Sequence, residues 1–539
     1  MNEANPAPLH AGAIDVDALL AALPARIDAI PRLVAARTPD APALVDAGRT
    51  LSYRDLVEAV DRHAACLRAA GVRTGDRVLL ASENCAAQIA LIFAAASVGA
   101  WSVNVNPRLT APELDAIRTH SGARIALYTA DVSDEAAAHA VRAGATRWAG
   151  GDGVLAGALN DDCAPEPAAG DPAAGDPAAG DPAAGDPVAA LVYTTGTTGQ
   201  PKGVMLSHRS LLFVASVSSR LRGLVPQDRA WGVLPVSHVY GLTSVMLGTL
   251  SAGACLHLAP RFTPEAMLDA LGDGSSSGLT IVQGVPAMYA RLLALARARG
   301  IAALGSRLRF AYAGGSPLDP AVKRDVERLL GVALHNGYGL TEAAPTVSQT
   351  RLDAPRADTS VGTAIPGVDV RVVDKAGSDV ADGVPGELWV RGPNLMQGYY
   401  RAPETTAATL RPGGWLNTGD MARRDPDGAL FIVGRTKELI IRSGFNVFPL
   451  EVETVLNAHP GVTQSAVVGR AAADGNEEVI AFVQPDPQHA PGVEALHAWA
   501  AQQLAAYKRP ARIVLMKALP AAATGKVLKH VLKTMAETI

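Results

Sequence analysis

The order of apolar and polar positions predicts strands that alternate with helices. Residues 76–82, 101–106 and 124–129 are short apolar runs with the length of buried strands, whereas the apolar segment 85–99 has the length of a helix. Short apolar runs return between residues 230 and 313, again separated by helical patterns. Strands and helices in this order indicate parallel sheets covered by helices, so we expect two α/β layered sheets.

The pattern changes after residue 361. Short strands at 368–373, 386–391 and 430–433 are separated by Gly, Pro and Asp turns, which is typical of a small antiparallel sheet or β-barrel. From residue 437 the chain has the pattern and length of a compact α+β unit. Since 539 residues exceed the size of one ordinary core, we predict a large N-terminal domain at 1–436 and a smaller mobile domain at 437–539.

One low-complexity stretch interrupts the N-terminal domain. The sequence AAGDP occurs four times in tandem between residues 168 and 187. Ala, Gly, Asp and Pro at a period of five cannot bury a face, so we predict a linker or loop at 165–190.

Composition narrows the class of protein. A hydrophobic content of 48% is typical of a globular chain, and a net charge of −4 does not favour nucleic acid or an anionic membrane as a partner. The four cysteines form no CxxC pair, which argues against a disulfide framework or a zinc site and fits a cytoplasmic location. No apolar run reaches the ~20 residues of a membrane-spanning helix. The assembly state stays open, with a homodimer as one option.

The segment 193–204 reads YTTGTTGQPKGV and lies between two predicted strands. Its glycines let backbone N–H groups form an anion-binding concavity, its hydroxyls add donors, and Lys202 adds a positive charge suited to phosphate. The candidate phosphate-binding residues are Thr194, Thr195, Gly196, Thr197, Thr198, Gly199 and Lys202. The segment is not a Walker A loop, because Pro201 precedes the lysine and Gly203 follows it. A Gly/Thr-rich surface turn is the alternative.

A second segment, HNGYGLTE at 335–342, combines groups that suit a nucleotide. Asn336 offers a donor and an acceptor to an adenine edge, Gly337 permits close backbone approach, and Tyr338 offers a stacking face. Glu342 is a hard oxygen ligand suited to Mg²⁺. A Gly-rich turn capped by a satisfied glutamate is the alternative.

Five further segments give weaker signals. They are LPVSHVYG at 234–241, WLNTGD at 415–420, GRTKELI at 434–440, SGFNVFPLEVE at 443–453 and TGK at 524–526. Together the seven resemble the AMP-forming adenylating superfamily, which includes acyl-CoA synthetases, adenylation domains and firefly-type luciferases. The resemblance runs from about residue 40 to residue 533 and is strongest to fatty-acid and aryl-acid CoA ligases.

The resemblance implies a role for individual residues. The implied catalytic residues are Lys526, Glu342, Thr341 and His238; the implied metal ligands are Thr194 and Glu342. Asp420 and Arg435 would bind the ribose, Lys437 would be the hinge, and Ser443 and Gly444 would line the passage for pantetheine. Arg442 and Arg470 are candidates for the 3′-phosphate of coenzyme A by charge alone.

The implied reaction uses ATP, Mg²⁺ and coenzyme A. A carboxylic acid and ATP form an acyl-adenylate and pyrophosphate, and coenzyme A then takes the acyl group and releases AMP. An enzyme that loads a carrier protein, a non-catalytic AMP-binding regulator and a luciferase-like oxygenase are the alternatives.

The substrate pocket implied by position consists of His238, Tyr240, Gly314, Gly315, Gly337, Gly339 and Pro345. Four glycines suggest a roomy pocket. The set contains no Arg or Lys that would pair with a second carboxylate, so we expect a hydrophobic fatty or aryl acid and disfavour dicarboxylic acids.

Overall fold

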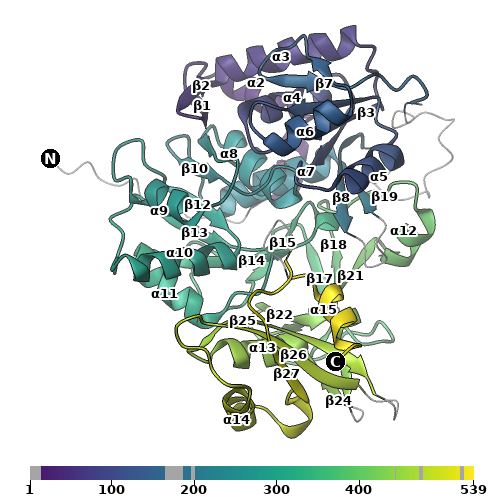
Figure 1. Ribbon diagram of the computed structural model, residues 1–539. Helices are drawn as coiled ribbons and strands as arrows, with labels where there is room; N and C mark the ends of the chain where they lie inside the picture. Colours follow the sequence, from purple (N-terminus) through teal and green to yellow (C-terminus); the bar gives the residue numbers. More distant parts are fainter. Residues whose placement is uncertain are drawn as a thin grey trace.

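The computed structural model describes residues 14–163, 165, 186–195, 201–442, 445–472, 477–521 and 527–539, without the side chains of Thr195 and Pro201. Two large sheets with flanking helices form the upper and middle parts of the molecule, and the C-terminal residues form a separate body below them (Figure 1). The predicted α/β class, with several sheets in a large N-terminal domain and a smaller C-terminal domain, is confirmed.

The first large sheet has eight strands. Their spatial order is β19 (Gly398–Tyr399), β9 (Pro201–Ser207), β8 (Val188–Thr195), β4 (Trp101–Val105), β3 (Arg77–Ala81), β5 (Ile125–Thr129), β7 (Val154–Ala156) and β6 (Thr146–Arg147). β3 pairs in parallel with β4 and β5, as the alternation of strands and helices predicts. β8 already includes residues 188–190, so the predicted linker at 165–190 is too long at its C-terminal end. Residues 166–185, which hold most of the repeat, lie outside the described part of the chain.

The second large sheet has nine strands. Their order is β16 (Thr363–Ala364), β15 (Thr346–Gln349), β14 (Leu334–Gly339), β13 (Phe310–Ala313), β12 (Ile281–Gly284), β10 (Arg229–Gly232), β11 (Cys255–Leu258), β1 (Pro42–Asp46) and β2 (Arg49–Ser52). Its central strands pair in parallel, whereas β14 and β15 are antiparallel. β14 therefore leads directly into a reversal of the chain at one edge of the parallel region.

Helices cover both large sheets. They are α1 (Val16–Ala22), α2 (Ala29–Ala35), α3 (Tyr53–Ala69), α4 (Ala86–Ser97), α5 (Ala111–Ser121), α6 (Asp134–Arg142), α7 (His208–Leu221), α8 (Gly248–Ser251), α9 (Pro264–Gly272), α10 (Pro286–Ala298) and α11 (Pro320–Leu330). Residues 87–96 of α4 are all buried, which fits its apolar sequence. A π-helical segment, η1 (Tyr240–Leu247), packs against α7 and continues into α8.

A third, antiparallel sheet follows. It contains β17 (Asp369–Val373), β18 (Gly386–Arg391), β21 (Trp415–Arg424), β20 (Leu410–Arg411) and β22 (Leu430–Arg435), and α12 (Pro403–Thr409) precedes β20. The predicted small antiparallel unit lies where the turn-rich sequence places it. Its last two long strands bring Asp420 opposite Arg435.

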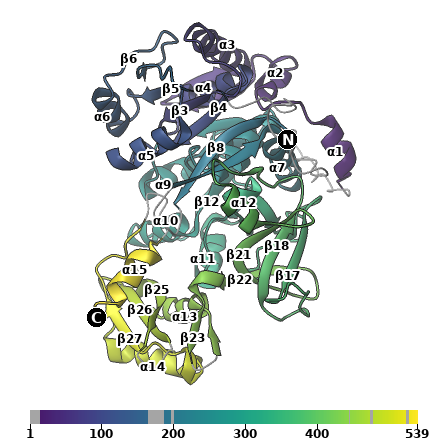
Figure 2. The same cartoon turned by 90° about the vertical axis from the view of Figure 1, so that its right-hand side faces the viewer.

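The C-terminal body has its own hydrophobic core. It contains η3 (Thr436–Glu438), β23 (Ile440–Arg442), β24 (Phe445–Val447), α13 (Pro449–Asn457), β25 (Val462–Ala471), β26 (Glu477–Pro485), α14 (Val493–Gln503), η4 (Ala506–Lys508), β27 (Arg512–Leu515) and α15 (Lys529–Ala536). The two core clusters of this body include only residues from Ile440 onward, and the large core of the three sheets ends at Leu430. The turned view in Figure 2 also shows this body set apart from the sheets above it.

Lys529 connects three parts of the C-terminal body. Its Nζ lies 2.9 Å from a carboxylate oxygen of Glu438 in η3 and 2.8 Å from one of Glu453 in α13. Glu453 also accepts a hydrogen bond from the Val467 backbone. Burial lowers the pKa of Lys529, but Glu453 and Glu438 raise it by more, so its pKa is higher than usual and the ammonium stays charged. The ion pairs therefore fix α15 beside the turn that follows β22.

Substitution Lys529→Met should weaken this connection. It leaves the mostly buried Glu453 carboxylate without its cation, and we expect the free energy of unfolding around β25 to fall by about 1–3 kcal/mol. Amide hydrogen exchange of β25 measures this change. Lys533→Met, which alters an exposed lysine of the same helix, is the control. Equal exchange in both variants would show that the ion pairs do not stabilise this body.

Candidate active site

The predicted phosphate loop connects the two strands of an antiparallel hairpin. β8 and β9 pair so that Thr194 lies opposite Lys202 at the end next to the loop. β9 is also paired on its other side by β19, so the strand that begins beside the loop is held from both edges. Gly196, Thr197, Thr198 and Gly199 and the side chain of Thr195 lie outside the described residues, and their predicted roles stay predictions.

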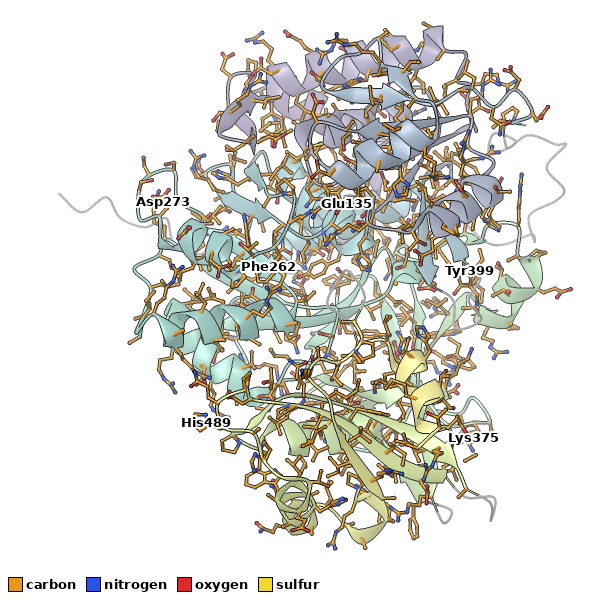
Figure 3. All side chains as sticks on the ribbon, in the orientation of Figure 1. Glu135, Phe262, Asp273, Lys375, Tyr399 and His489 are labelled. Atoms are coloured by element: carbon orange, nitrogen blue, oxygen red, sulfur yellow. The ribbon has the colours of Figure 1, made fainter. Side chains whose placement is uncertain are left out.

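Glu342 lies in a short 3₁₀ turn, η2 (Thr341–Ala343), directly after β14. The hydroxyl of Tyr399 donates a hydrogen bond of 2.7 Å to its carboxylate, and the Nζ of Lys202 lies 5.4 Å from the centre of the Tyr399 ring. Burial and the Glu342 charge raise the pKa of Tyr399, so the phenol stays a donor. The structure thus brings Lys202 and Glu342 to the same aromatic ring, which is labelled in Figure 3.

Tyr399 was not among the residues predicted from the sequence. Its β19 strand is only two residues long and joins β9, almost two hundred positions earlier in the chain. A glycine followed by two tyrosines was the only local signal. Nothing in the spacing indicated that this ring meets Glu342.

The residues around Glu342 suit Mg²⁺. Mg²⁺ in phosphate-transfer sites is usually held by one or two carboxylates together with substrate phosphates and water. No group of three or more His, Cys, Asp and Glu side chains that could hold a metal occurs among the described residues. Glu342, a single carboxylate hydrogen-bonded to the tyrosine whose ring Lys202 approaches, fits a cation that arrives with a polyphosphate.

Asp420 forms a polar cluster with Tyr338 and Arg435. The Tyr338 hydroxyl donates a 2.5 Å hydrogen bond to one carboxylate oxygen, and Nε of Arg435 lies 3.2 Å from the other. The Asp420 residue is only 6% exposed. Burial and the Asp420 charge raise the pKa of Tyr338 well above its usual value. Because a carboxylate oxygen accepts more than one hydrogen bond, Asp420 can still accept from a diol.

Asn336 has a divided role. Its amide nitrogen donates to the carbonyls of Thr359 and Ser360 at 3.0 and 3.1 Å, and its carbonyl oxygen is buried without a partner. An unpaired buried acceptor costs stability unless a ligand supplies a donor. The amino group of adenine is such a donor, so the structure fits the predicted contact through one side of the amide.

Substitution Asp420→Asn should mainly impair nucleotide binding. It removes the charge that pairs with Arg435 and the acceptor for a ribose hydroxyl, and we expect KM for ATP to rise about 10- to 100-fold. Steady-state kinetics with varied ATP measure the effect. Asp427→Asn changes an exposed aspartate of the turn before β22 and is the control. An unchanged KM would contradict a ribose role for Asp420.

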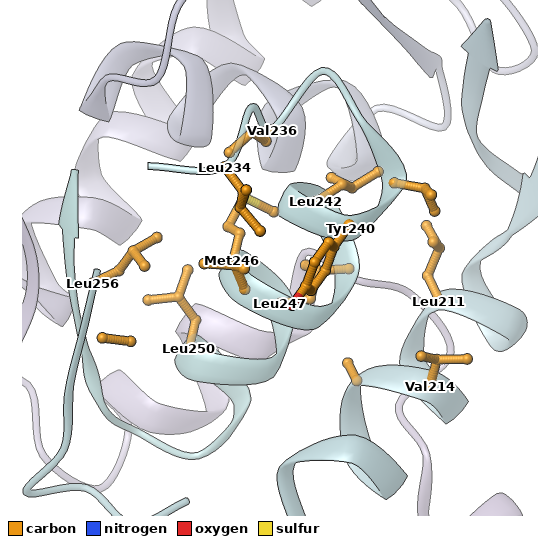
Figure 4. Packing of buried hydrophobic residues seen from close by; sticks show 14 of the residues in the cluster. Leu211, Val214, Leu234, Val236, Tyr240, Leu242, Met246, Leu247, Leu250 and Leu256 are labelled. Carbon is orange, nitrogen blue, oxygen red and sulfur yellow. The ribbon is translucent and has the colours of Figure 1, made fainter. Parts of the chain in front are cut away.

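The predicted substrate residues lie together around η1 and the ends of β13 and β14. Tyr240 begins η1 and is buried, with its hydroxyl unpartnered, and Figure 4 shows it among the buried apolar residues of the same segment, such as Leu242 and Met246. A Cβ atom added at Gly314 would lie 3.4 Å from the Tyr240 ring. His238 is exposed and its Nδ1 accepts a hydrogen bond from the Tyr240 backbone.

The prediction that the glycines leave a roomy pocket is wrong at two positions. A Cβ at Gly337 would lie 1.7 Å from the Tyr312 hydroxyl, and one at Gly339 would lie 2.3 Å from the Pro345 carbonyl oxygen. These glycines admit neighbouring protein atoms instead of a ligand. At Gly315, φ is +85°, a conformation that favours glycine. The backbone conformation therefore accounts for a glycine at this position.

An arginine from outside the predicted set lies near these residues. Arg222, at the C-terminal end of α7, packs over the Tyr312 ring, and its charge lowers the pKa of Tyr240 against the larger effect of burial. The sequence did not reveal this contact, because a loop and strand β10 separate Arg222 from the substrate segment at 234–241.

The C-terminal candidates are only partly described. Lys437 is exposed in η3. Ser443 and Gly444 lie outside the described residues, between the paired strands β23 and β24, and Lys526 also lies outside them. Arg442 donates to the carbonyls of Tyr507 and Arg509, and Arg470 pairs with Glu478. Both arginines therefore already have partners in the protein.

The described part of the chain contains no helix that is long and apolar enough to cross a bilayer. This agrees with the absence of such a run in the sequence.

Comparisons with known proteins agree with this geometry. Residues 32–400 match the AMP-binding enzyme family, and residues 451–526 match the AMP-binding enzyme C-terminal domain. A feruloyl-CoA synthase of Amycolatopsis sp is 38% identical over 500 residues, which cover 91% of this chain and 95% of that protein. A 4-coumarate–CoA ligase 2 of Oryza sativa subsp. japonica is 34% identical over 521 residues, covering 93% and 90%. The crystal structure of ATP-bound MatB from Rhodopseudomonas palustris is 31% identical, with a TM-score of 0.81 over 95% of this chain and 99% of that one.

Proposed function

Because this chain belongs to the AMP-binding enzyme family, we propose that it is an AMP-forming carboxylic acid:CoA ligase. The observation that supports the proposal is that two clusters of polar side chains lie close together along the segment 338–342. Tyr338 contacts Asp420, which also pairs with Arg435, and four residues later Glu342 contacts Tyr399 beside Lys202. A nucleoside triphosphate needs such a pair: hydrogen-bond acceptors for the ribose, and charges for the phosphates and their cation.

The first half-reaction needs no side-chain base. A carboxylic acid is already ionised at pH 7, and its oxygen attacks the α-phosphorus of ATP while the bond to the leaving pyrophosphate breaks. Lys202 and the loop hydroxyls bind the phosphates, and Thr341 donates to the α-phosphate. Glu342 and Thr194 would hold Mg²⁺, which offsets phosphate charge when bound. Lys526 bridges the acid and the α-phosphate and stabilises the charge that develops between them.

The second half-reaction uses a different arrangement of the same chain. We propose that the domain from residue 437 onward turns about Lys437, which withdraws Lys526 and brings Ser443 and Gly444 to the site. The sulfur of coenzyme A attacks the acyl carbon, the acyl–oxygen bond breaks, and AMP leaves. The separate hydrophobic core that begins at Ile440 supports a boundary at 436/437.

The substrate belongs to the hydrophobic aryl or fatty acids. The feruloyl-CoA synthase and 4-coumarate–CoA ligase support the aryl class, and a long-chain-fatty-acid–CoA ligase of Escherichia coli O157:H7, 32% identical over 529 residues, supports the fatty class. The aromatic residues Tyr240 and Tyr312 near Gly314 favour an aryl acid, because rings pack edge-to-face with them.

Two further predictions accompany the proposal. The four free and widely spaced cysteines fit a cytoplasmic location. A homodimer stays a prediction, and size-exclusion chromatography with light scattering measures it.

Pyrophosphate release with ATP and Mg²⁺, across aryl, fatty and dicarboxylic acids and with or without coenzyme A, tests the proposed function. Acid-dependent release together with thioester formation is the expected result. Release without thioester would indicate a carrier-protein acceptor. No release with any acid would overturn the ligase proposal.

A further inference from the structure

Arg222 is a buried cation that the proposed reaction does not use. It caps the C-terminal end of α7 and is 1% exposed. Its Nη1 donates to the side-chain oxygen of Gln283 at 2.7 Å, and the guanidinium lies over the Tyr312 ring, 4.5 Å from its centre. Its Nε and Nη2 are buried without hydrogen-bond partners, and none of the carboxylates in the described ranges forms an ion pair with it.

The two unpartnered nitrogens form one recognition edge. Nε and Nη2 lie on the same side of a guanidinium and donate two parallel hydrogen bonds, which is the geometry that binds a carboxylate in a bidentate manner. Nη1, on the other side, is already held by Gln283. The arginine is therefore oriented by the protein, and no carboxylate of the described residues occupies its bidentate edge.

The surroundings of Arg222 connect this edge to the proposed substrate residues. Gln283, Tyr312 and His335 are register neighbours on the adjacent strands β12, β13 and β14. Tyr240, whose buried hydroxyl also has no partner, packs edge-on against Tyr312 with ring centres 6.3 Å apart. Both tyrosine rings contact the position that a Cβ of Gly314 would occupy. Arg222 thus stacks on Tyr312, and Tyr312 and Tyr240 border the predicted acid-binding residue Gly314.

The positive charge of Arg222 makes an unoccupied Nε/Nη2 edge unfavourable for the stability of the protein. A buried cation without an anion or full hydrogen bonding destabilises a protein, and a purely apolar ligand would leave the guanidinium in that state. An anionic oxygen group on the ligand would satisfy Nε and Nη2 together. Ordered water is the alternative occupant, and it would satisfy the hydrogen bonds without neutralising the charge.

We propose that Arg222 is a specificity residue that binds a second carboxylate, at the end of an aryl or alkyl acid remote from the reacting carboxyl group. This inference rests on the proposed ligase function and narrows its substrate class. The acid has a hydrophobic body, which packs against Tyr240 and Tyr312, and an anionic distal end. It reverses the expectation that dicarboxylic acids are disfavoured.

A series of matched acids tests the inference without altering the protein. Each aryl or alkyl body is compared with a distal carboxylate, a distal hydroxyl, a distal carboxamide and no distal group, by pyrophosphate release and thioester formation. We expect kcat/KM for the carboxylate to exceed that for the unsubstituted acid about 100-fold or more, since a site built for a polar group rejects analogues that lack it. A preference for the hydroxyl would show that Arg222 binds a neutral acceptor and would overturn the assignment of a carboxylate. Equal use of all four acids would indicate that water occupies the edge.

Variants assign the preference to the arginine. Arg222→Lys keeps the charge but loses the bidentate edge, and Arg222→Met removes both; we expect the carboxylate preference to fall at least ~10-fold in the first and to disappear in the second. Tyr240→Phe removes only an unpartnered hydroxyl and should lower the same preference with the least risk to folding. Arg220→Met, an exposed residue of the same helix, is the control. An unchanged preference in all three variants overturns the inference even if the enzyme is a ligase, whereas inactivity of the wild type towards every acid overturns the ligase proposal itself.

Discussion

Substitution Lys526→Ala is expected to slow acid-dependent pyrophosphate release about 100- to 1000-fold. Lys526 is proposed to contact the attacking carboxylate and the α-phosphate where negative charge accumulates, and the loss of one such contact lowers kcat about 100- to 1000-fold. The second half-reaction should survive, because Lys526 is withdrawn during thioester formation. Supplying a chemically prepared acyl-adenylate together with coenzyme A separates the two steps.

Two observations would contradict this role of Lys526. One is normal pyrophosphate release by the variant, and the other is an equal loss of both half-reactions, which would indicate damage to the whole domain. Lys533→Ala provides the control, since it removes an exposed lysine from the same domain. Lys529 is unsuitable as a control because it connects η3, α13 and α15.

Substitution Glu342→Gln should produce the second largest loss. The amide keeps the size of the side chain and can still accept from Tyr399, but it removes the negative charge that a hard cation requires. We expect the rate of adenylate formation to fall about 100-fold and the Mg²⁺ concentration for half-maximal activity to rise. Single-turnover formation of acyl-adenylate at varied Mg²⁺ measures both.

Tyr399→Phe separates the charge of Glu342 from its orientation. This variant keeps the carboxylate and the ring beside Lys202, and removes only the 2.7 Å hydrogen bond. We expect a fall of about 3- to 10-fold, the size of one ordinary hydrogen bond. If Glu342→Gln lost no more than Tyr399→Phe, Glu342 would have a structural role and not a role in metal binding.

The local elements could be predicted from the sequence because they depend on neighbouring residues. β18 has the bounds that the apolar run at 386–391 predicts. α4 lies within the apolar segment 85–99 that was predicted as a helix. The nucleotide candidates were found for the same reason: Asn336, Tyr338 and Glu342 lie within seven residues of each other.

The contacts that could not be predicted join segments distant in the sequence. Tyr399 reaches Glu342 only because β19 pairs with β9, and Arg222, at the end of α7, stacks on Tyr312 of β13, about ninety residues later in the chain. β1 likewise enters the second sheet beside β11, more than two hundred residues later. Such contacts depend on tertiary packing, and a single sequence contains no local periodicity that reports them.

The π-helical segment η1 has a consequence for how such a site can diversify. A π turn contains one residue more than an α turn, and each residue of an α-helix advances the side-chain direction by about 100°. Loss of one residue within 240–247 would let the segment relax into a continuous α-helix with α8. A different side chain would then face Gly314 in place of Tyr240. Deletion of a single codon can therefore change which side chain lies next to Gly314 while every other residue stays the same.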